Sequence, residues 1–261
     1  MLKKRLIGVV TVKNGWAVQS IGYRRYLPLG KPECLVENLD RWGADEILVQ
    51  VIDRSSRNLG PDLELLERLG ALGLETPLIY AGGIRSISDG VKTIQLGADR
   101  IVVDAILHDD LSAVRGLSER LGAQALIASL PLSLQDKGLV WLDYRLHTST
   151  PISDEVLSLI QSDIISEVLI VDWQHEGRPG GFEQKLVEKF PLQDVPIIAF
   201  GGLSEHEQMR ALLQSSNVSA VAVGNFLSYH EHAIQEYKEA LTGMPLRFAS
   251  YESTFSLIAD V

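Results

Sequence analysis

The chain has 261 residues, 46% of them hydrophobic, and a formal net charge of −10 from 34 acidic and 24 basic side chains. This acidic balance argues against nucleic-acid binding, and a single cysteine, Cys34, excludes an internal disulfide and fits a reducing, cytoplasmic compartment. No apolar run approaches the length of a bilayer span, and no Walker loop, CxxC pair or HExxH motif is present. We therefore expect one soluble domain with no membrane partner, no cofactor and no metal.

Short apolar runs alternate with amphipathic segments along the whole chain. The apolar runs predict strands near residues 5–12, 46–52, 77–81, 100–104, 125–130, 167–172, 196–200 and 219–223. The segments between them predict helices at 32–42, 61–72, 88–97, 111–121, 154–161, 182–190, 205–214 and 233–241. About eight strand–helix units in some 250 residues are typical of a single (β/α)8 TIM barrel. A doubly wound open sheet is the alternative.

The two halves of the chain repeat one plan. Residues 77–86 and 195–204 are both apolar runs that end in two glycines, and the second lies about 120 residues after the first. The strand candidates at 46–51 and 167–172 keep nearly the same offset. An open sheet does not predict a half-chain repeat, so the pattern favours a barrel built from two half-barrels.

Each Gly-Gly turn is a candidate anion site. Glycines let backbone N–H groups approach a ligand, and the start of the next helix favours a negative charge, usually a phosphate. Ser204 is expected to cap the helix that follows the second turn. In a barrel both turns lie at the C-terminal ends of the strands, so a ligand with a phosphate at each end is our hypothesis. A plain strand-to-helix turn is the alternative interpretation.

Several motifs resemble a known family. The segments 1–7, 12–15, 43–46, 81–86, 97–100 and 199–202 are similar to the cyclase subunit of imidazole glycerol phosphate synthase, HisF. The resemblance extends from Met1 to about Gly243, which predicts a barrel domain at 1–243 and a C-terminal extension at 244–261. It implies a half-barrel repeat with two phosphate sites, a HisH-like glutaminase partner, and ammonia that passes through the barrel to the mouth.

The acid–base pair of that family is absent. The resemblance implies two catalytic aspartates, at the ends of the first and fifth strands, where this chain has Thr11 and either Leu130 or Pro131. None of these side chains can transfer a proton near neutral pH, and each lost group costs on the order of 10²–10⁴ in rate. Asp53, Asp136 and Asp172 are candidates for relocated carboxylates, with Asp172 a weak catalytic candidate. Carboxylates on such loops are more often helix caps or solvated surface groups.

The phosphate sites differ between the halves. The resemblance assigns the first site to Gly82, Gly83, Asp104 and Ala105, where Asp104-Ala105 replaces the Asn-Thr of the family. A carboxylate there repels a phosphate, which predicts a weakened first site. The second site is expected to be better preserved; it comprises Glu176, Gly177, Gly201, Gly202, Gly224 and Asn225.

Four charged residues begin predicted strands at the opposite end of the barrel. Arg5, Glu46, Arg100 and Glu167 match the ring of alternating charges that, in the family, closes the barrel and gates ammonia entry. A purely stabilising network is the alternative. Asp45 and Asp99, beside these positions, could meet a partner subunit.

Three smaller patterns remain. Residues 138–147 alternate and predict a hairpin in the loop after the fifth strand, where Arg145 and His147 could contact an anion. His175 is a candidate proton donor after the sixth strand, although no paired carboxylate is evident. Aromatic and aliphatic residues at 248–258 could dock on the barrel or on a partner.

A lost acid–base pair with a retained charge ring resembles HisF paralogues associated with glycosyl amidation. The favoured hypothesis is a barrel that binds a glutaminase and delivers ammonia to an ATP-dependent sugar amidotransferase for surface polysaccharide. The second hypothesis is an imidazole glycerol phosphate synthase cyclase, a lyase of histidine biosynthesis, with relocated catalytic groups. The third is a binding protein for a phosphorylated small molecule with no role in ammonia transfer.

Overall fold

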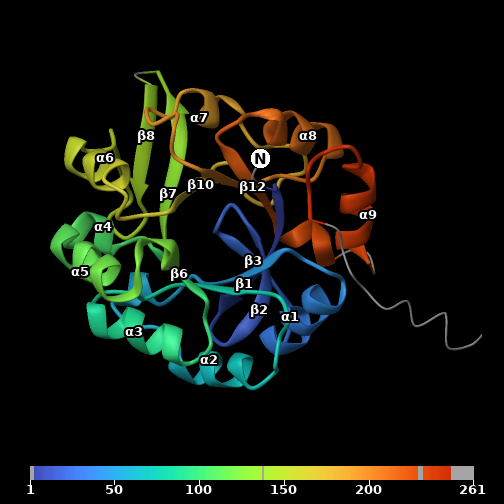
Figure 1. Cartoon of the computed structure of the whole chain (residues 1–261), viewed down its shortest axis with the longest axis horizontal. Coiled ribbons are helices and arrows are strands. Elements are labelled where there is room, and N and C mark those ends of the chain that lie inside the picture. The colour runs from blue at the N-terminus through green and yellow to red at the C-terminus, as the bar shows by residue number, and fades with distance from the viewer. Residues whose placement is uncertain (1–2, 137, 229–231, 248–261) are drawn as a thin grey trace, which may run out of the picture.

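Eight parallel strands close into a barrel in the computed structural model, which describes residues 3–136, 138–228 and 232–247. Around the barrel the order is β1, β4, β5, β6, β7, β10, β11 and β12, and β12 pairs with β1 (Figure 1). The (β/α)8 prediction is confirmed. The strands are β1 Arg5–Lys13, β4 Glu46–Val51, β5 Leu78–Ala81, β6 Arg100–Val103, β7 Leu126–Gln135, β10 Glu167–Asp172, β11 Ile197–Phe200 and β12 Val218–Val223.

Helices surround the barrel, and several begin at a capping side chain. The carboxylate of Asp62 accepts from the N–H of Leu65 at 3.1 Å, and the hydroxyl of Ser86 accepts from that of Asp89 at 3.1 Å. The helices are α1 Pro32–Arg41, α2 Leu63–Gly70, α3 Ile87–Gln95, α4 Ile106–Asp109, α5 Leu111–Leu121, α6 Asp154–Gln161, α7 Lys185–Glu188, α8 His206–Gln214 and α9 Ala233–Ala240, with 3-10 turns η1 Ser55–Arg57, η2 Ala123–Ala125 and η3 Asn225–Ser228. Within the described residues, none of them is both long and apolar enough to cross a membrane.

Helix α7 is shorter than the sequence predicts. Its four residues lie within the expected segment at 182–190, which also contains the buried Phe182 and Phe190. Phe190 precedes Pro191, and the residue before a proline disfavours helical backbone, so the helix ends early.

Alternation along the strands produces two separate cores. Inside the barrel lie apolar side chains such as Ile7, Val9, Leu48, Ile127 and Leu169. The intervening residues of the same strands face outward and pack against the helices. A residue's parity along its strand therefore decides whether its side chain can reach the barrel interior.

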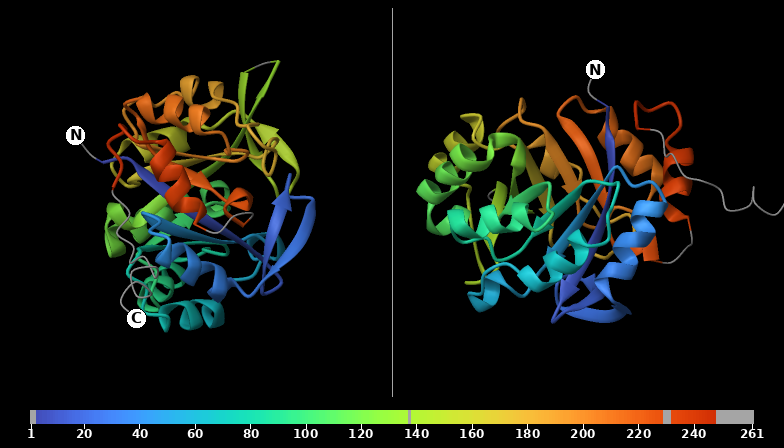
Figure 2. Two further views of the ribbon diagram at one scale, coloured as in Figure 1. Left: turned by 90° about the vertical axis from the view of Figure 1, so that its right-hand side faces the viewer. Right: turned by 60° about the horizontal axis from the view of Figure 1, so that its bottom comes forward.

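Two antiparallel additions extend the barrel. Strands β2 (Trp16–Ile21) and β3 (Arg25–Gly30) form a hairpin beside β1, and β8 (Gly138–Asp143) and β9 (Thr148–Thr150) continue from β7. Both additions lie on the same side of the molecule in the left-hand view of Figure 2. The β2–β3 hairpin is absent from the sequence prediction. The loop after β7 does form antiparallel hairpins as predicted, but the segment 138–147 supplies the strand shared by two of them, because β8 pairs with both β7 and β9.

The described start of the C-terminal extension lies against the first strand. The N–H of Lys4 donates to the carbonyl of Pro245 at 2.9 Å, and Lys4 and Leu246 form a parallel bridge. The docking prediction for 248–258 falls outside the described residues. The boundary between a barrel at 1–243 and an extension at 244–261 stays a prediction.

Candidate functional site

The C-terminal strand ends, called the mouth below, contain the two positions at which the family resemblance implies aspartates. Thr11 is 6% exposed, on the inward-facing side of β1 with Ile7 and Val9. Pro131 shares the inward parity of Ile127 on β7, whereas Leu130 packs in the outer core. Of the two alternatives for the second aspartate, Pro131 therefore faces the mouth and Leu130 does not. Neither Thr11 nor Pro131 can act as an acid or base near neutral pH.

Asp172 is not positioned as a catalytic group. It ends β10 with parity opposite to that of Leu169 and Val171, so it lies outside the barrel interior. Its carboxylate accepts from the backbone N–H of Glu183 at 2.8 Å and lies 2.8 Å from the Nδ1 of His175. His175 thus has the carboxylate partner that the sequence did not reveal, and this partner holds its loop. The structure therefore does not support the prediction that Asp172 is catalytic.

Protein groups occupy the first Gly-Gly turn, Gly82-Gly83, after β5. The N–H of Gly83 donates to the hydroxyl of Ser55 at 3.1 Å, and that hydroxyl donates to the carboxylate of Asp104 at 3.3 Å. The phenol of Tyr144 donates to the same carboxylate at 2.5 Å. Partial burial raises the pKa of Asp104, and the donors oppose this rise. Ala105, the next residue, is 3% exposed.

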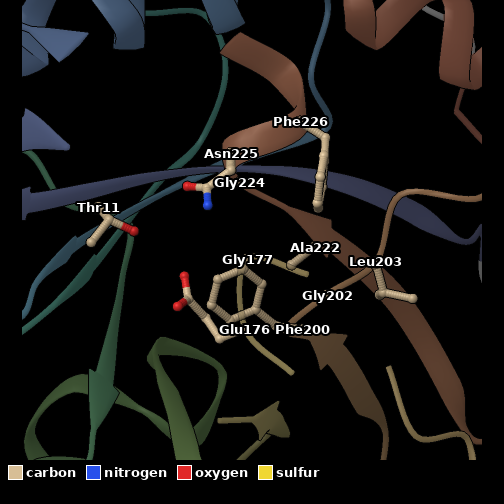
Figure 3. Close-up of a pocket in the computed structure, with 11 residues that line it drawn as sticks. Thr11, Glu176, Gly177, Phe200, Gly202, Leu203, Ala222, Gly224, Asn225 and Phe226 are labelled. Atoms are coloured by element: carbon tan, nitrogen blue, oxygen red, sulfur yellow. The ribbon is translucent and has the colours of Figure 1, made fainter. Parts of the chain in front are cut away.

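The second Gly-Gly turn, Gly201-Gly202, borders a pocket at the mouth. Figure 3 shows the hydroxyl of Thr11 and the carboxylate of Glu176 pointing toward its middle, with Asn225 above them. The lining comprises Thr11, Glu176, Gly177, Phe200, Gly201, Gly202, Leu203, Ala222, Gly224, Asn225 and Phe226. All six residues predicted for the second phosphate site lie together here.

The glycines of both turns are also required by packing. A Cβ on Gly83 would lie 2.5 Å from the carbonyl oxygen of Gly60, and one on Gly202 would lie 2.6 Å from that of His175. Both residues have positive φ, +74° and +79°. The turns therefore need glycine whether or not a ligand binds, so the glycine pair alone does not identify a site.

Ser204 does not cap α8, contrary to the prediction. Its hydroxyl accepts from the N–H of Gly180 at 2.8 Å, and the residue before the helix is Glu205. The serine thus fastens the loop after β10 to the second Gly-Gly turn.

Glu176 is the only carboxylic acid among the residues that line the pocket. It is 3% exposed and accepts from the hydroxyl of Ser20 and the N–H of Tyr23, both at 3.1 Å. Burial raises the pKa of Glu176 to about 7, because its hydrogen bonds only partly offset the loss of water. The group can hold or release a proton near neutral pH.

The β2–β3 hairpin covers the mouth. The side-chain amide of Asn225 bridges the backbone N–H and carbonyl of Ser20, and the N–H of Gly22 donates to the carbonyl of Glu176 at 2.9 Å. Tyr23, in the hairpin turn, packs against the inner core and accepts a hydrogen bond from Gln50 at 3.2 Å. The strand–turn pattern of residues 16–30 could have indicated this hairpin, but nothing in the sequence indicated where it docks.

Four charged side chains form a closed ring at the opposite end, called the floor ring below: Arg5, Glu46, Arg100 and Glu167. Arg5 pairs with Glu46 at 2.9 Å and with Glu167. Arg100 pairs with Glu46 at 3.3 Å and with Glu167 at 2.7 Å. Each cation thus bridges both anions, and the side chains are between 7% and 13% exposed.

Neighbouring charges are used within the chain. Asp45 is buried, accepts from the N–H of Leu6 at 2.7 Å and pairs with Lys238 at 2.8 Å, so its predicted role as a partner contact is wrong. Asp99 is exposed but accepts from the N–H of Leu78 at 2.7 Å. At the other end of the barrel, in the loop after β4, Asp53 pairs with Arg57 at 3.3 Å.

The remaining candidates lie away from the pocket. Arg145 pairs with Asp109 at 2.5 Å and with Asp143 at 3.0 Å, while His147 is exposed in a turn. Asp136 is exposed in the turn after β7, and its role as a relocated carboxylate stays a prediction. Across residues 3–136, 138–228 and 232–247, no three His, Cys, Asp or Glu side chains gather as a metal site.

Comparison with known proteins gives one consistent result. The family model described as histidine biosynthesis protein matches residues 5–235. The imidazole glycerol phosphate synthase subunit HisF of Staphylococcus epidermidis is 30% identical over 250 residues, covering 92% of this chain and 97% of its own. That of Natranaerobius thermophilus is 24% identical over 245 residues, covering 93% and 97%. A putative subunit hisF2 of Vibrio vulnificus is 25% identical over 237 residues, covering 89% and 86%.

Proposed function

The chain belongs to the histidine biosynthesis protein family, and we propose that it is a HisF-like barrel that binds a HisH-like glutaminase and conducts ammonia without cyclase chemistry. Delivery of that ammonia to an ATP-dependent amidotransferase, for amidination of a sugar in surface polysaccharide, is the reaction we favour. The cytoplasm is the compartment that this role requires.

The contrast between the two ends of the barrel carries the proposal. At the mouth, the inward-facing strand ends have Thr11 and Pro131, so no pair of carboxylates converges there to transfer protons. At the floor, two arginines and two glutamates remain as a closed ring. A barrel with a charge ring but without its acid–base pair supports conduction over cyclisation.

The interior between the two ends suits a small neutral molecule. It is lined by apolar side chains, several of them small, such as Ala81, Ala220 and Ala222. An ion would lose its hydration there at high cost, whereas ammonia is neutral. Passage requires the ring to open, which we expect to be triggered when the mouth is occupied.

A cyclase with a relocated acid–base group is the second candidate. Glu176 favours it, because its buried carboxyl group lines the pocket and its pKa is raised to about 7. A single carboxyl group does not replace a facing pair, so we rank this candidate second.

The test combines the full chain with a HisH-like glutaminase. We expect the barrel to stimulate glutamine hydrolysis, measured as glutamate released, and to make no imidazole product from the cyclase substrate with ammonium chloride. Arg5→Ala should lower the stimulation, while Arg68→Ala, at an exposed pair with Glu33, should not. Imidazole formation that disappears in Glu176→Gln would replace this proposal with the second candidate, and absence of any stimulation would contradict it.

A further inference from the structure

The half-barrel repeat allows the two Gly-Gly turns to be compared position by position. Asp104 is the first residue after β6, and Gly224 is the first residue after β12. Ser55 is the fourth residue after β4, and Glu176 is the fourth after β10. The first turn is thus flanked by Ser55 and Asp104, and the second turn by Glu176 and Gly224 at the matching positions.

At the first turn the hydrogen-bond donors end on Asp104. The N–H of Gly83 donates to Ser55, the hydroxyl of Ser55 donates to the carboxylate, and Tyr144 donates to it from the β8–β9 turn. A bound phosphate would accept hydrogen bonds from the same kinds of group, namely backbone N–H groups and hydroxyls. The side chain of Asp104 therefore fills the place of an anion.

At the second turn the corresponding position has no side chain. Gly224 leaves the pocket open, and a Cβ there would meet its nearest neighbour, in Phe200, at 3.6 Å, an ordinary contact. The backbone N–H groups of Gly202 and Leu203 donate to no other residue in the described part of the chain. No side chain of the described residues accepts from these N–H groups, whereas at the first turn the chain of donors ends on Asp104.

Polar side chains also point into this pocket. Thr11 is 6% exposed, and its hydroxyl bonds to no other side chain or backbone group of the described residues (Figure 3). Glu176 is 3% exposed, and Ser20 and Tyr23 both donate to the same oxygen of its carboxylate, Oε2.

We propose that the carboxyl group of Asp104 takes the place of a ligand anion at the first Gly-Gly turn, so that this barrel binds a polyhydroxylated ligand with a single phosphate, at the second turn. The inference rests on the proposed function and narrows its substrate class. The phosphate meets the backbone N–H groups, and Thr11 and Glu176 meet hydroxyl groups of the ligand. A second phosphate is disfavoured by the carboxyl group of Asp104, which fills the place of an anion at the first turn.

Calorimetric titration of the full chain tests this, with ribose 5-phosphate and ribulose 1,5-bisphosphate as probes. We expect one site per chain and affinities for the two probes that agree within about threefold, because the second phosphate gains no contact. Gly224→Asp copies the first turn onto the second and should weaken ribose 5-phosphate binding by roughly tenfold or more. Gly224→Ala, the matched control, adds a methyl group without a charge and should lose clearly less affinity than Gly224→Asp.

Asp104→Gly is the reciprocal change and should make the bisphosphate bind at least about tenfold more tightly than the monophosphate. If this variant does not fold, the wild-type stoichiometry and the Gly224 pair still decide. Two phosphate sites in wild type, a strong wild-type preference for the bisphosphate, no monophosphate binding, or equal binding by Gly224→Asp and Gly224→Ala would each overturn the inference.

The same preparations separate this inference from the proposed function. Glutaminase stimulation without monophosphate binding would contradict the single-phosphate site and leave ammonia conduction standing. Monophosphate binding without any stimulation would contradict ammonia conduction and leave the single-phosphate site standing.

Discussion

Glycines at the mouth are required for different reasons, and the backbone shows which. Gly202 and Gly15 have nearly equal φ values, +79° and +78°. A Cβ on Gly202 would lie 2.6 Å from the carbonyl oxygen of His175, whereas one on Gly15 has no atom within 4 Å. The first position combines backbone strain with a steric clash, and the second has strain alone.

Gly202→Ala should therefore lower the free energy of unfolding by about 3 kcal/mol or more, and Gly15→Ala by only about 1 kcal/mol. Urea denaturation of both variants measures the difference. Equal losses would show that the loop after β10 yields to the added methyl group, and that the second Gly-Gly turn is not tightly packed.

Glu176 makes stability depend on pH around neutrality. Burial raises its pKa from 4.5 to about 7, so the folded chain holds a proton that the unfolded chain has released between these values. The stability contributed by this group is complete below about pH 4.5 and is lost as the pH rises through about 7, a loss of roughly 3 kcal/mol.

Glu176→Gln should remove this loss, because the amide does not titrate and keeps an oxygen for Ser20 and Tyr23. Between about pH 5 and pH 8, the unfolding free energy of the variant should fall less than that of wild type by roughly 2–3 kcal/mol. Glu33→Gln serves as the control, since an exposed arginine, Arg68, lowers the pKa of Glu33 and moves its titration below this window. Parallel pH profiles for wild type and Glu176→Gln would contradict the expectation.

At the scale of elements, the floor ring joins four strands that are far apart in sequence. Its residues are the first of β1, β4, β6 and β10, so the parallel strands bring all four to the same end of the barrel. Ser219 adds to it, with its hydroxyl 2.6 Å from Glu167 and 3.1 Å from Arg5. The two arginines share the two glutamates, and all four side chains are almost shielded from solvent. Each charge is therefore compensated only while all four residues are present.

Glu167→Gln should therefore destabilise the chain by about 3 kcal/mol, because it leaves two buried arginines to share Glu46. Glu33→Gln, at the exposed pair with Arg68, should cost less than about 1 kcal/mol. The two nearby arginines lower the pKa of Glu167, so its contribution is complete above about pH 4.5 and declines as the pH falls below that. Chemical denaturation of both variants at neutral pH checks this, and equal costs would show that the ring is not a cooperative unit.

At the scale of the whole molecule, the two ends of the barrel have diverged from each other. The floor ring takes Arg5, Glu46 and Arg100 from the first half-barrel and Glu167 from the second, with Glu46 and Glu167 at equivalent strand starts. The mouth is asymmetric, because Asp104 fills one half and Gly224 leaves the other open. The hairpin β2–β3 and the β8–β9 extension then cover the two halves separately. On our proposals, this barrel uses one ligand pocket at the mouth, above the floor ring.

The amino-acid sequence by itself determined the repeating strand–helix order, and with it the barrel. Buried parallel strands are continuous apolar runs, and glycines mark the turns, so periodicity and spacing suffice for that prediction. The charges at the strand starts and the missing aspartates could also be predicted, because each depends on a residue type at one end of a strand.

Only the tertiary structure decided which side chains meet. The alternation along the strands directs Pro131 into the barrel and Leu130 and Asp172 outward. The sequence could not choose between Leu130 and Pro131, because the alignment was uncertain by one residue. Tyr144 reaches Asp104 from 40 residues away, and Ser20 reaches Glu176 across 156. Such contacts depend on how hairpins dock over the mouth, which is a balance of packing and hydrogen bonding between distant segments that no local pattern records.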